Sequence, residues 1–226
     1  MYVSDLGLVG PAQSDDLFHF TGRLGERPSE VPLEIRAMTP QQRLDAILRE
    51  EQFRAFAPFG ASVPCVCFSE SPPDHLAHLI RQQRFSPWGI VGSRKTLLGL
   101  QGGSVAYVSD EVYARFKAAG LAHWAVRTSP ASTWMHEREW RIPRSDGLLK
   151  IGGCNAILIG DINWRPSLVE TDAQMNIATG DDLDPSDPAE GTQPAMALPT
   201  LWRQSEVWVW DKAAEAVTKY KPGELC

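Results

Sequence analysis

The chain has 226 residues, of which 43% are hydrophobic and 22% are charged, and its net charge at pH 7 is −6. This composition excludes a wholly disordered protein and is typical of a globular one. No apolar run approaches the length of about 18 residues that a membrane span needs, and no basic and apolar leader opens the sequence. Four cysteines do not make a disulfide framework in a chain of this length. We therefore expect a soluble, cytoplasmic protein without a membrane partner.

The charge is unevenly distributed along the chain. Residues 161–226 contain 12 acidic and 5 basic side chains, whereas residues 1–160 contain 16 acidic and 17 basic ones. The acidity therefore belongs to the C-terminal part, and the rest of the chain is nearly neutral. This balance leaves a nucleic-acid substrate open but supplies no basic surface that would indicate one.

Short strands and three modest helices are predicted in the first 160 residues. Thr39-Pro40-Gln41-Gln42 has the residues of a capping box, so a helix is expected from there to about Glu51. A second helix follows Ser71-Pro72-Pro73-Asp74, and a third begins at Ser109 or Asp110 and ends at Gly120. The expected strands are 17–21, 62–68, 88–91, 105–108, 122–127, 137–142 and 155–160, with a short element near 96–100.

These elements do not alternate regularly, which favours the α+β class with a split, largely antiparallel sheet and a few helices. We expect one domain at 17–160 and an acidic C-terminal extension at 161–226. Within the extension, residues 180–199 are acidic and rich in Pro and Gly, which indicates an exposed loop or linker. The sequence VWVWDKAAEAVTKY near the end predicts a strand and a short helix.

The segment most informative about chemistry is TWMHEREWRIP, residues 133–143. In a strand, Glu137 and Glu139 would lie on one face, and Arg138 on the other. Two neighbouring carboxylates can bind sugar hydroxyls and stabilise positive charge that develops on a sugar carbon. Alternatively, this is an edge strand whose glutamates form ion pairs with Arg138, Arg141 or Arg144.

Three segments occur in a distinctive order along the chain: FHFT at 18–21, VPCVCFSESP at 63–72, and the late Glu-x-Glu-Trp-Arg at 137–141. Their order resembles that of the ADP-ribosyltransferase superfamily. Two branches are most similar, the bacterial DNA-ADP-ribosylating toxins of toxin–antitoxin pairs and proteins grouped with abortive phage resistance. The chain departs from the His-Tyr-Glu pattern because Phe68 and Ser69 occupy the place of the middle tyrosine.

The resemblance implies transfer of ADP-ribose from NAD to a macromolecule (DNA, RNA or protein) by a toxin or defence effector, with an antitoxin or immunity protein as a further partner. It implies that Glu139 binds the ribose 2′-hydroxyl and that Glu137 orients or deprotonates the acceptor. His19 and Thr21 would bind the adenosine-side ribose or the nicotinamide amide. Phe68 and Ser69 would line the nicotinamide pocket.

Other outcomes stay open. Water could replace the acceptor, which would make the protein an NAD hydrolase. A catalytically inactive member of the fold could instead serve as a binding or immunity module.

Two further motifs carry weaker signals. GIVGSRKT at 89–96 is close to a phosphate-binding loop, but Arg94 stands where the second glycine is needed. Arg94 could still contact the NAD diphosphate, or it belongs to a solvated turn. Cys65-x-Cys67 with His75-x-x-His78 fits no common zinc spacing, so no metal site is expected.

Overall fold

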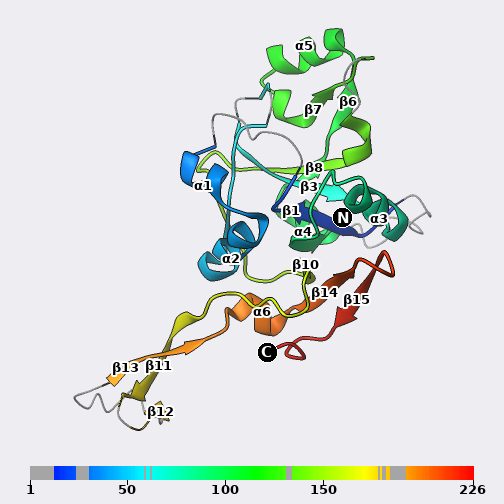
Figure 1. The fold of residues 1–226 in the computed structure, drawn as a ribbon. Coiled ribbons are helices and arrows are strands. Elements are labelled where there is room, and N and C mark those ends of the chain that lie inside the picture. Colours follow the sequence, from blue (N-terminus) through cyan, green and yellow to red (C-terminus); the bar gives the residue numbers. More distant parts are fainter. Residues whose placement is uncertain are drawn as a thin grey trace.

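The computed structural model describes residues 13–23, 31–58, 60–61, 63–130, 134–177, 179, 182–183 and 192–226. They form an α+β fold around an eight-stranded sheet with the order β15-β14-β10-β4-β1-β3-β8-β5 (Figure 1). Every pairing in this sheet is antiparallel except β10 with β14, so the predicted class is confirmed. The strands are β1 Asp16–Phe20, β3 Cys65–Glu70, β4 Gly89–Ser93, β5 Gly103–Ser104, β8 Glu139–Pro143, β10 Ala156–Ile159, β14 Glu206–Asp211 and β15 Ala216–Tyr220.

Helices cover both faces of the sheet, with α2 and α3 on opposite sides in Figure 1. The larger core includes Leu44 and Leu48 of α2, whereas Leu76 of α3 belongs to a separate cluster with Phe18. The predicted capping box is present, because the Thr39 hydroxyl accepts from the Gln42 N–H and the Gln42 side chain accepts from the Thr39 N–H. The α-helices are α1 Leu33–Ala37, α2 Pro40–Glu50, α3 Pro73–Arg81, α4 Arg94–Gly99, α5 Asp110–Ala118 and α6 Thr200–Gln204.

Between β5 and β8 the chain forms a small β-α-β unit, residues 105–128, which we call the wing. Its strands β6 (Ala106–Val108) and β7 (Ala125–Arg127) are parallel and are joined by α5. Tyr113 and Ala125 belong to its own small core. The wing lies at the top of Figure 1, directly above β8.

The C-terminal part differs from the sequence-based expectation in two places. Residues 206–220 form a β-hairpin, β14 and β15, and not a strand followed by a helix. The Asp211 side chain accepts hydrogen bonds from the N–H groups of Ala213 and Ala214, which ends β14 in a turn and lets the chain reverse. Because β14 pairs with β10, these residues complete the sheet that the first 160 residues begin.

The expected linker at 180–199 contains a strand, β13 (Thr192–Ala197), which pairs with β11 (Val169–Asn176) in a small sheet apart from the main one. Residues 182–183 form β12 on the other side of β11, and residues 180–181 and 184–191 lie outside the described residues. The remaining strands, β2 (Gln52–Arg54) and β9 (Leu148–Lys150), pair with each other. No helix among the described residues is long and apolar enough to cross a membrane.

Candidate functional site

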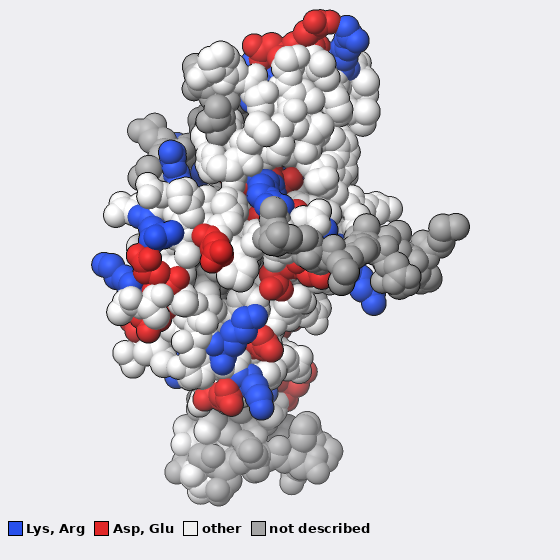
Figure 2. All heavy atoms as spheres, turned by 90° about the vertical axis from the view of Figure 1, so that its right-hand side faces the viewer, with Lys and Arg blue, Asp and Glu red and all other residues white. Residues whose placement is uncertain are grey.

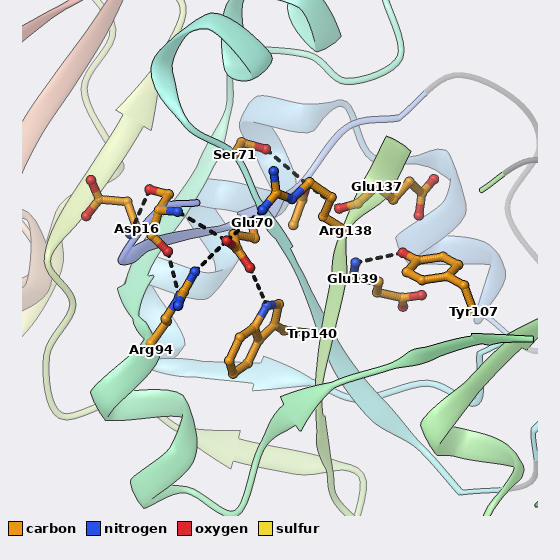
Figure 3. A network of polar contacts seen from close by, with 11 residues as sticks. Asp16, Glu70, Ser71, Arg94, Tyr107, Glu137, Arg138, Glu139 and Trp140 are labelled. Carbon is orange, nitrogen blue, oxygen red and sulfur yellow. Dashed lines mark hydrogen bonds and ion pairs between the residues drawn. The ribbon is translucent and has the colours of Figure 1, made fainter. Parts of the chain in front are cut away.

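The segment with the two glutamates is not one continuous strand. Residues Trp134–Glu137 form a 3₁₀ turn, and β8 begins only at Glu139. Arg138, between them, has a φ of 45°, in the left-handed region that few residues other than glycine adopt. Glu137 and Glu139 nevertheless lie on one side of this turn, and the Arg138 side chain points to the other side, toward Glu70 (Figure 3). The predicted strand is therefore wrong over residues 137–138, although the two carboxylates do lie together.

Glu139 forms a buried ion pair two residues along its own strand. Its two carboxylate oxygens accept hydrogen bonds of 2.9 and 2.8 Å from Nε and Nη2 of Arg141. Arg141 is only 4% exposed, and its third nitrogen donates to the His123 carbonyl of the wing at 2.8 Å. Burial alone would lower the pKa of Arg141, but the bonds and the charge of Glu139 raise it. Glu139 is thus a fixed carboxylate beside a permanent cation.

Glu137 has a looser environment. Its side chain is 14% exposed, and its ion-pair partner Arg23, at 3.3 Å, is 42% exposed. Burial raises the pKa of Glu137; the Arg23 charge opposes this increase and the Glu139 charge adds to it. A carboxyl whose pKa is raised can exchange a proton closer to neutral pH, which is what a general base requires.

A tyrosine of the wing lies against this pair. The Tyr107 hydroxyl accepts a hydrogen bond from the Glu139 N–H at 2.8 Å, and it lies on the same side of the turn as both carboxylates (Figure 3). Burial raises the pKa of the Tyr107 phenol, which keeps it neutral. The hydroxyl therefore acts as an acceptor in this contact.

On the other side of the turn, Glu70 is the centre of a buried polar network. Its carboxylate accepts hydrogen bonds from the Ser14 N–H at 3.1 Å, Arg94 at 2.5 Å, Arg138 at 2.9 Å and the Trp140 indole at 3.0 Å. Burial alone would raise the pKa of Glu70, but the bonds from Trp140 and Ser14 and the two arginine charges together lower it. Arg94, for which a contact with the NAD diphosphate was considered, is therefore part of this network (Figure 3).

His19 and Phe68 do not lie on the same face of the sheet as Glu139. The His19 ring is 4.6 Å from the Phe53 ring and 5.6 Å from the Phe68 ring. Phe68 and Trp140 are both in the large core, and Glu139 precedes Trp140, so alternation places Glu139 on the opposite face.

Thr21 and Ser69 form hydrogen bonds within the fold. The Thr21 hydroxyl, in a residue that is 2% exposed, donates to the carbonyls of Pro40 and Trp88. The Ser69 hydroxyl donates to the Glu137 carbonyl at 2.6 Å. Ser69 is also the strand partner of Glu139, so it contacts residues 137–139, which we call the glutamate turn.

Sequence reasoning did not assign a role to Glu70, Tyr107 or Arg141. The i, i+2 spacing of Glu139 and Arg141 does predict that they share a strand face, and Arg141 was named as one of three alternative partners. The position of Tyr107 depends on how the wing folds over β8, and no local pattern in the sequence indicates it.

Among the described residues, no group of three or more His, Cys, Asp and Glu side chains is placed to hold a metal ion. The chain matches no protein-family model, no curated protein and no solved structure. Its function is therefore inferred from the site itself.

Proposed function

We propose that this protein transfers ADP-ribose from NAD to a macromolecular acceptor at the site formed by Glu137, Glu139 and Tyr107. The observation that carries the proposal is the pair of carboxylates on one side of the Arg138 turn, in different environments. A carboxyl whose pKa is raised by burial, beside a second carboxylate held in an ion pair, is an arrangement typical of sites that act on glycosidic bonds.

The residues suit the two parts of the reaction. When the bond between ribose and nicotinamide breaks, nicotinamide leaves with the bonding electrons, and positive charge develops on the ribose. Glu139, held by Arg141, would stabilise this charge and accept a hydrogen bond from the ribose 2′-hydroxyl. Glu137 would take the proton of the acceptor oxygen or nitrogen as it bonds to the ribose carbon. The Tyr107 hydroxyl would donate to an uncharged oxygen of the substrate.

The acceptor class is not indicated by the surface charge. The described residues on the face in Figure 2 mix Lys and Arg with Asp and Glu, without a continuous basic area. DNA, RNA and protein acceptors all remain part of the proposal, as does a role as a toxin or defence effector.

A second candidate function is a binding or immunity module without turnover. It is favoured by the Glu139–Arg141 ion pair, which neutralises much of the charge that catalysis would use, and by the position of His19 on the opposite face of the sheet. In this alternative Glu139 and His19 stabilise the fold, and the protein neither cleaves nor binds NAD.

The test follows nicotinamide release from NAD labelled in the nicotinamide ring, and transfer of an adenine label to DNA, RNA or protein from a cell extract. Glu139→Gln is expected to lower both by at least about 100-fold, because it removes the charge beside the ribose. Glu137→Gln is expected to lower transfer more than release. Glu111→Gln, in an exposed ion pair with Arg115 on α5, is the matched control and should leave both unchanged.

Two results would contradict parts of this proposal. Release that persists in Glu139→Gln would remove this residue from the reaction. A wild-type protein that neither releases nicotinamide nor binds NAD in calorimetry would exclude the enzyme and favour the binding module.

A further inference from the structure

The last two residues of β3, Ser69 and Glu70, hold three consecutive residues of the glutamate turn. The Ser69 hydroxyl donates to the carbonyl of Glu137, and the Glu70 N–H donates to the carbonyl of Arg138 at 3.1 Å. The Glu70 carboxylate accepts from the Arg138 side chain, and Ser69 is the strand partner of Glu139. Both the backbone and the central side chain of the turn are thus fixed from one short segment.

The turn needs such support because of its backbone conformation. A left-handed conformation at a residue other than glycine is unfavourable and persists only where the surroundings enforce it. Without that support, Arg138 would return to an ordinary strand or helix conformation. The direction of the neighbouring Glu137 side chain would then change.

The two arginines that contact Glu70 have different positions. Arg94 is almost fully buried, with a side chain 10% exposed, and its Nε donates to the Ser14 carbonyl. Arg138 is 30% exposed and lies between the two site glutamates. Arg94 therefore compensates the buried charge of Glu70. Arg138 instead connects the Glu70 carboxylate to the turn, so the position of Glu70 determines that of the turn.

We propose that Glu70 is a positioning residue: through Arg138 it fixes the turn that directs Glu137 and Glu139 to one side. The catalytic consequence rests on the function proposed above. The position of the glutamates can be measured without any turnover.

The experiment compares two arginine variants of the full chain, because Glu70→Gln would leave the buried Arg94 without its partner. Arg138→Gln removes the ion pair between the Glu70 carboxylate and the turn. Arg94→Gln removes the ion pair of the same carboxylate with α4, away from the turn. Trp140→Phe removes a third donor to Glu70 and replaces Arg94→Gln as control if that variant does not fold. The titration of the Glu137 carboxyl is followed by NMR with ¹³C-labelled glutamate and is assigned with Glu137→Gln.

In the wild type, Glu137 should titrate above its ordinary pKa of 4.5, because burial and the charge of Glu139 raise this pKa by more than the charges of Arg23, His136 and Arg141 lower it. In Arg138→Gln the turn opens to water, and this pKa should fall toward 4.5. Arg138→Lys should retain part of the increase in the Glu137 pKa, and the control Arg94→Gln should retain all of it. Nicotinamide release should fall about 100-fold in Arg138→Gln, since small displacements of reacting groups have effects of this size.

An unchanged titration in Arg138→Gln, or an equal shift in the control, would overturn the positioning role. If the wild type releases no nicotinamide, the proposed function fails, and the titration still decides whether Glu70 positions the turn.

Discussion

Glu70 and Glu137 are both largely buried carboxylates, and they lie on opposite sides of the Arg138 turn. Glu70 accepts hydrogen bonds from four groups, two of which are arginines. Among the residues that the structure describes, the ion-pair partner of Glu137 is Arg23, whose side chain is 42% exposed. The first arrangement favours the ionised carboxylate and lowers its pKa, whereas the second leaves a carboxyl whose pKa is raised. Burial alone therefore does not distinguish a structural acid from a reactive one, whereas the number and exposure of its donors do.

The largest effect is expected from removing the Glu70 carboxylate. Glu70→Ala leaves Arg94 charged, buried and without its partner, and the free energy of unfolding should fall by about 3–5 kcal/mol. Urea denaturation followed by tryptophan fluorescence measures this change. A loss below about 1 kcal/mol would show that water replaces the carboxylate and that the Glu70 network contributes little to the stability of the fold.

The pH dependence of stability should have opposite signs for the two acids. The pKa of Glu70 is lowered in the folded state, so its contribution is present above the ordinary value of 4.5 and is lost as the pH falls through the folded value. The pKa of Glu137 is raised, so ionisation costs stability as the pH rises from 4.5 through the folded value. Relative to the wild type, Glu137→Gln should therefore gain stability as the pH rises from 4.5. The deficit of Glu70→Gln should be full above 4.5 and should shrink as the pH falls below it.

These trends are measured by urea denaturation of both variants between about pH 3.5 and 7, the range in which carboxylates titrate. Parallel curves for the two variants would contradict the contrast between them.

A smaller effect is expected from replacing either of two tyrosines of the wing, and it should distinguish their roles. The Tyr107 hydroxyl contacts the Glu139 N–H, whereas the Tyr113 hydroxyl donates to the Gly60 carbonyl at 2.7 Å. Each change to Phe should cost about 1 kcal/mol of unfolding free energy. Only Tyr107→Phe should also lower nicotinamide release, by about tenfold, the equivalent of one hydrogen bond. Equal release from both variants would assign Tyr107 to the fold alone.

The smallest effect on stability is expected at an exposed ion pair, and it is the reference for the loss expected in Glu70→Ala. Glu111 and Arg115 form an ion pair on α5 whose side chains are 77% and 76% exposed. Glu111→Ala should change the unfolding free energy by less than about 0.5 kcal/mol, because water and salt screen such pairs. A larger loss would mean that the wing depends on its surface charges.

Features that depend on neighbours in the sequence were predicted well. The capping box at Thr39 is present as expected, and Gly120, with a φ of 73°, follows the end of α5. The α+β class followed from the irregular order of short elements. The adjacency of Glu137 and Glu139 was expected from alternation in a strand, whereas a 3₁₀ turn and the left-handed Arg138 produce it in the structure. The capping box and the end of α5 are each decided within about four residues.

Features that depend on distant segments were not predictable in this way. The donors to Glu70 come from residues 14, 94, 138 and 140, which only the finished sheet brings together. The left-handed conformation of Arg138 contradicts the preference of its residue type, so the sequence predicts an unbroken strand there. The hairpin of β14 and β15 was predicted in part as a helix, because its alanines favour that state locally while pairing with the sheet decides otherwise.

The parallel pairing of β10 with β14 also has a consequence for synthesis on the ribosome. Strands β1, β3, β4, β8 and β10 can assemble as soon as residue 159 has emerged, but β14 lies beyond the 46 residues 160–205. Until then, one edge of β10 is without its partner strand, and Val207 and Trp208, buried later, are not yet available to cover the sheet. Such an edge pairs readily with other nascent chains. Slow translation across residues 160–205 would therefore favour aggregation, and a chaperone that covers β10 would suppress it.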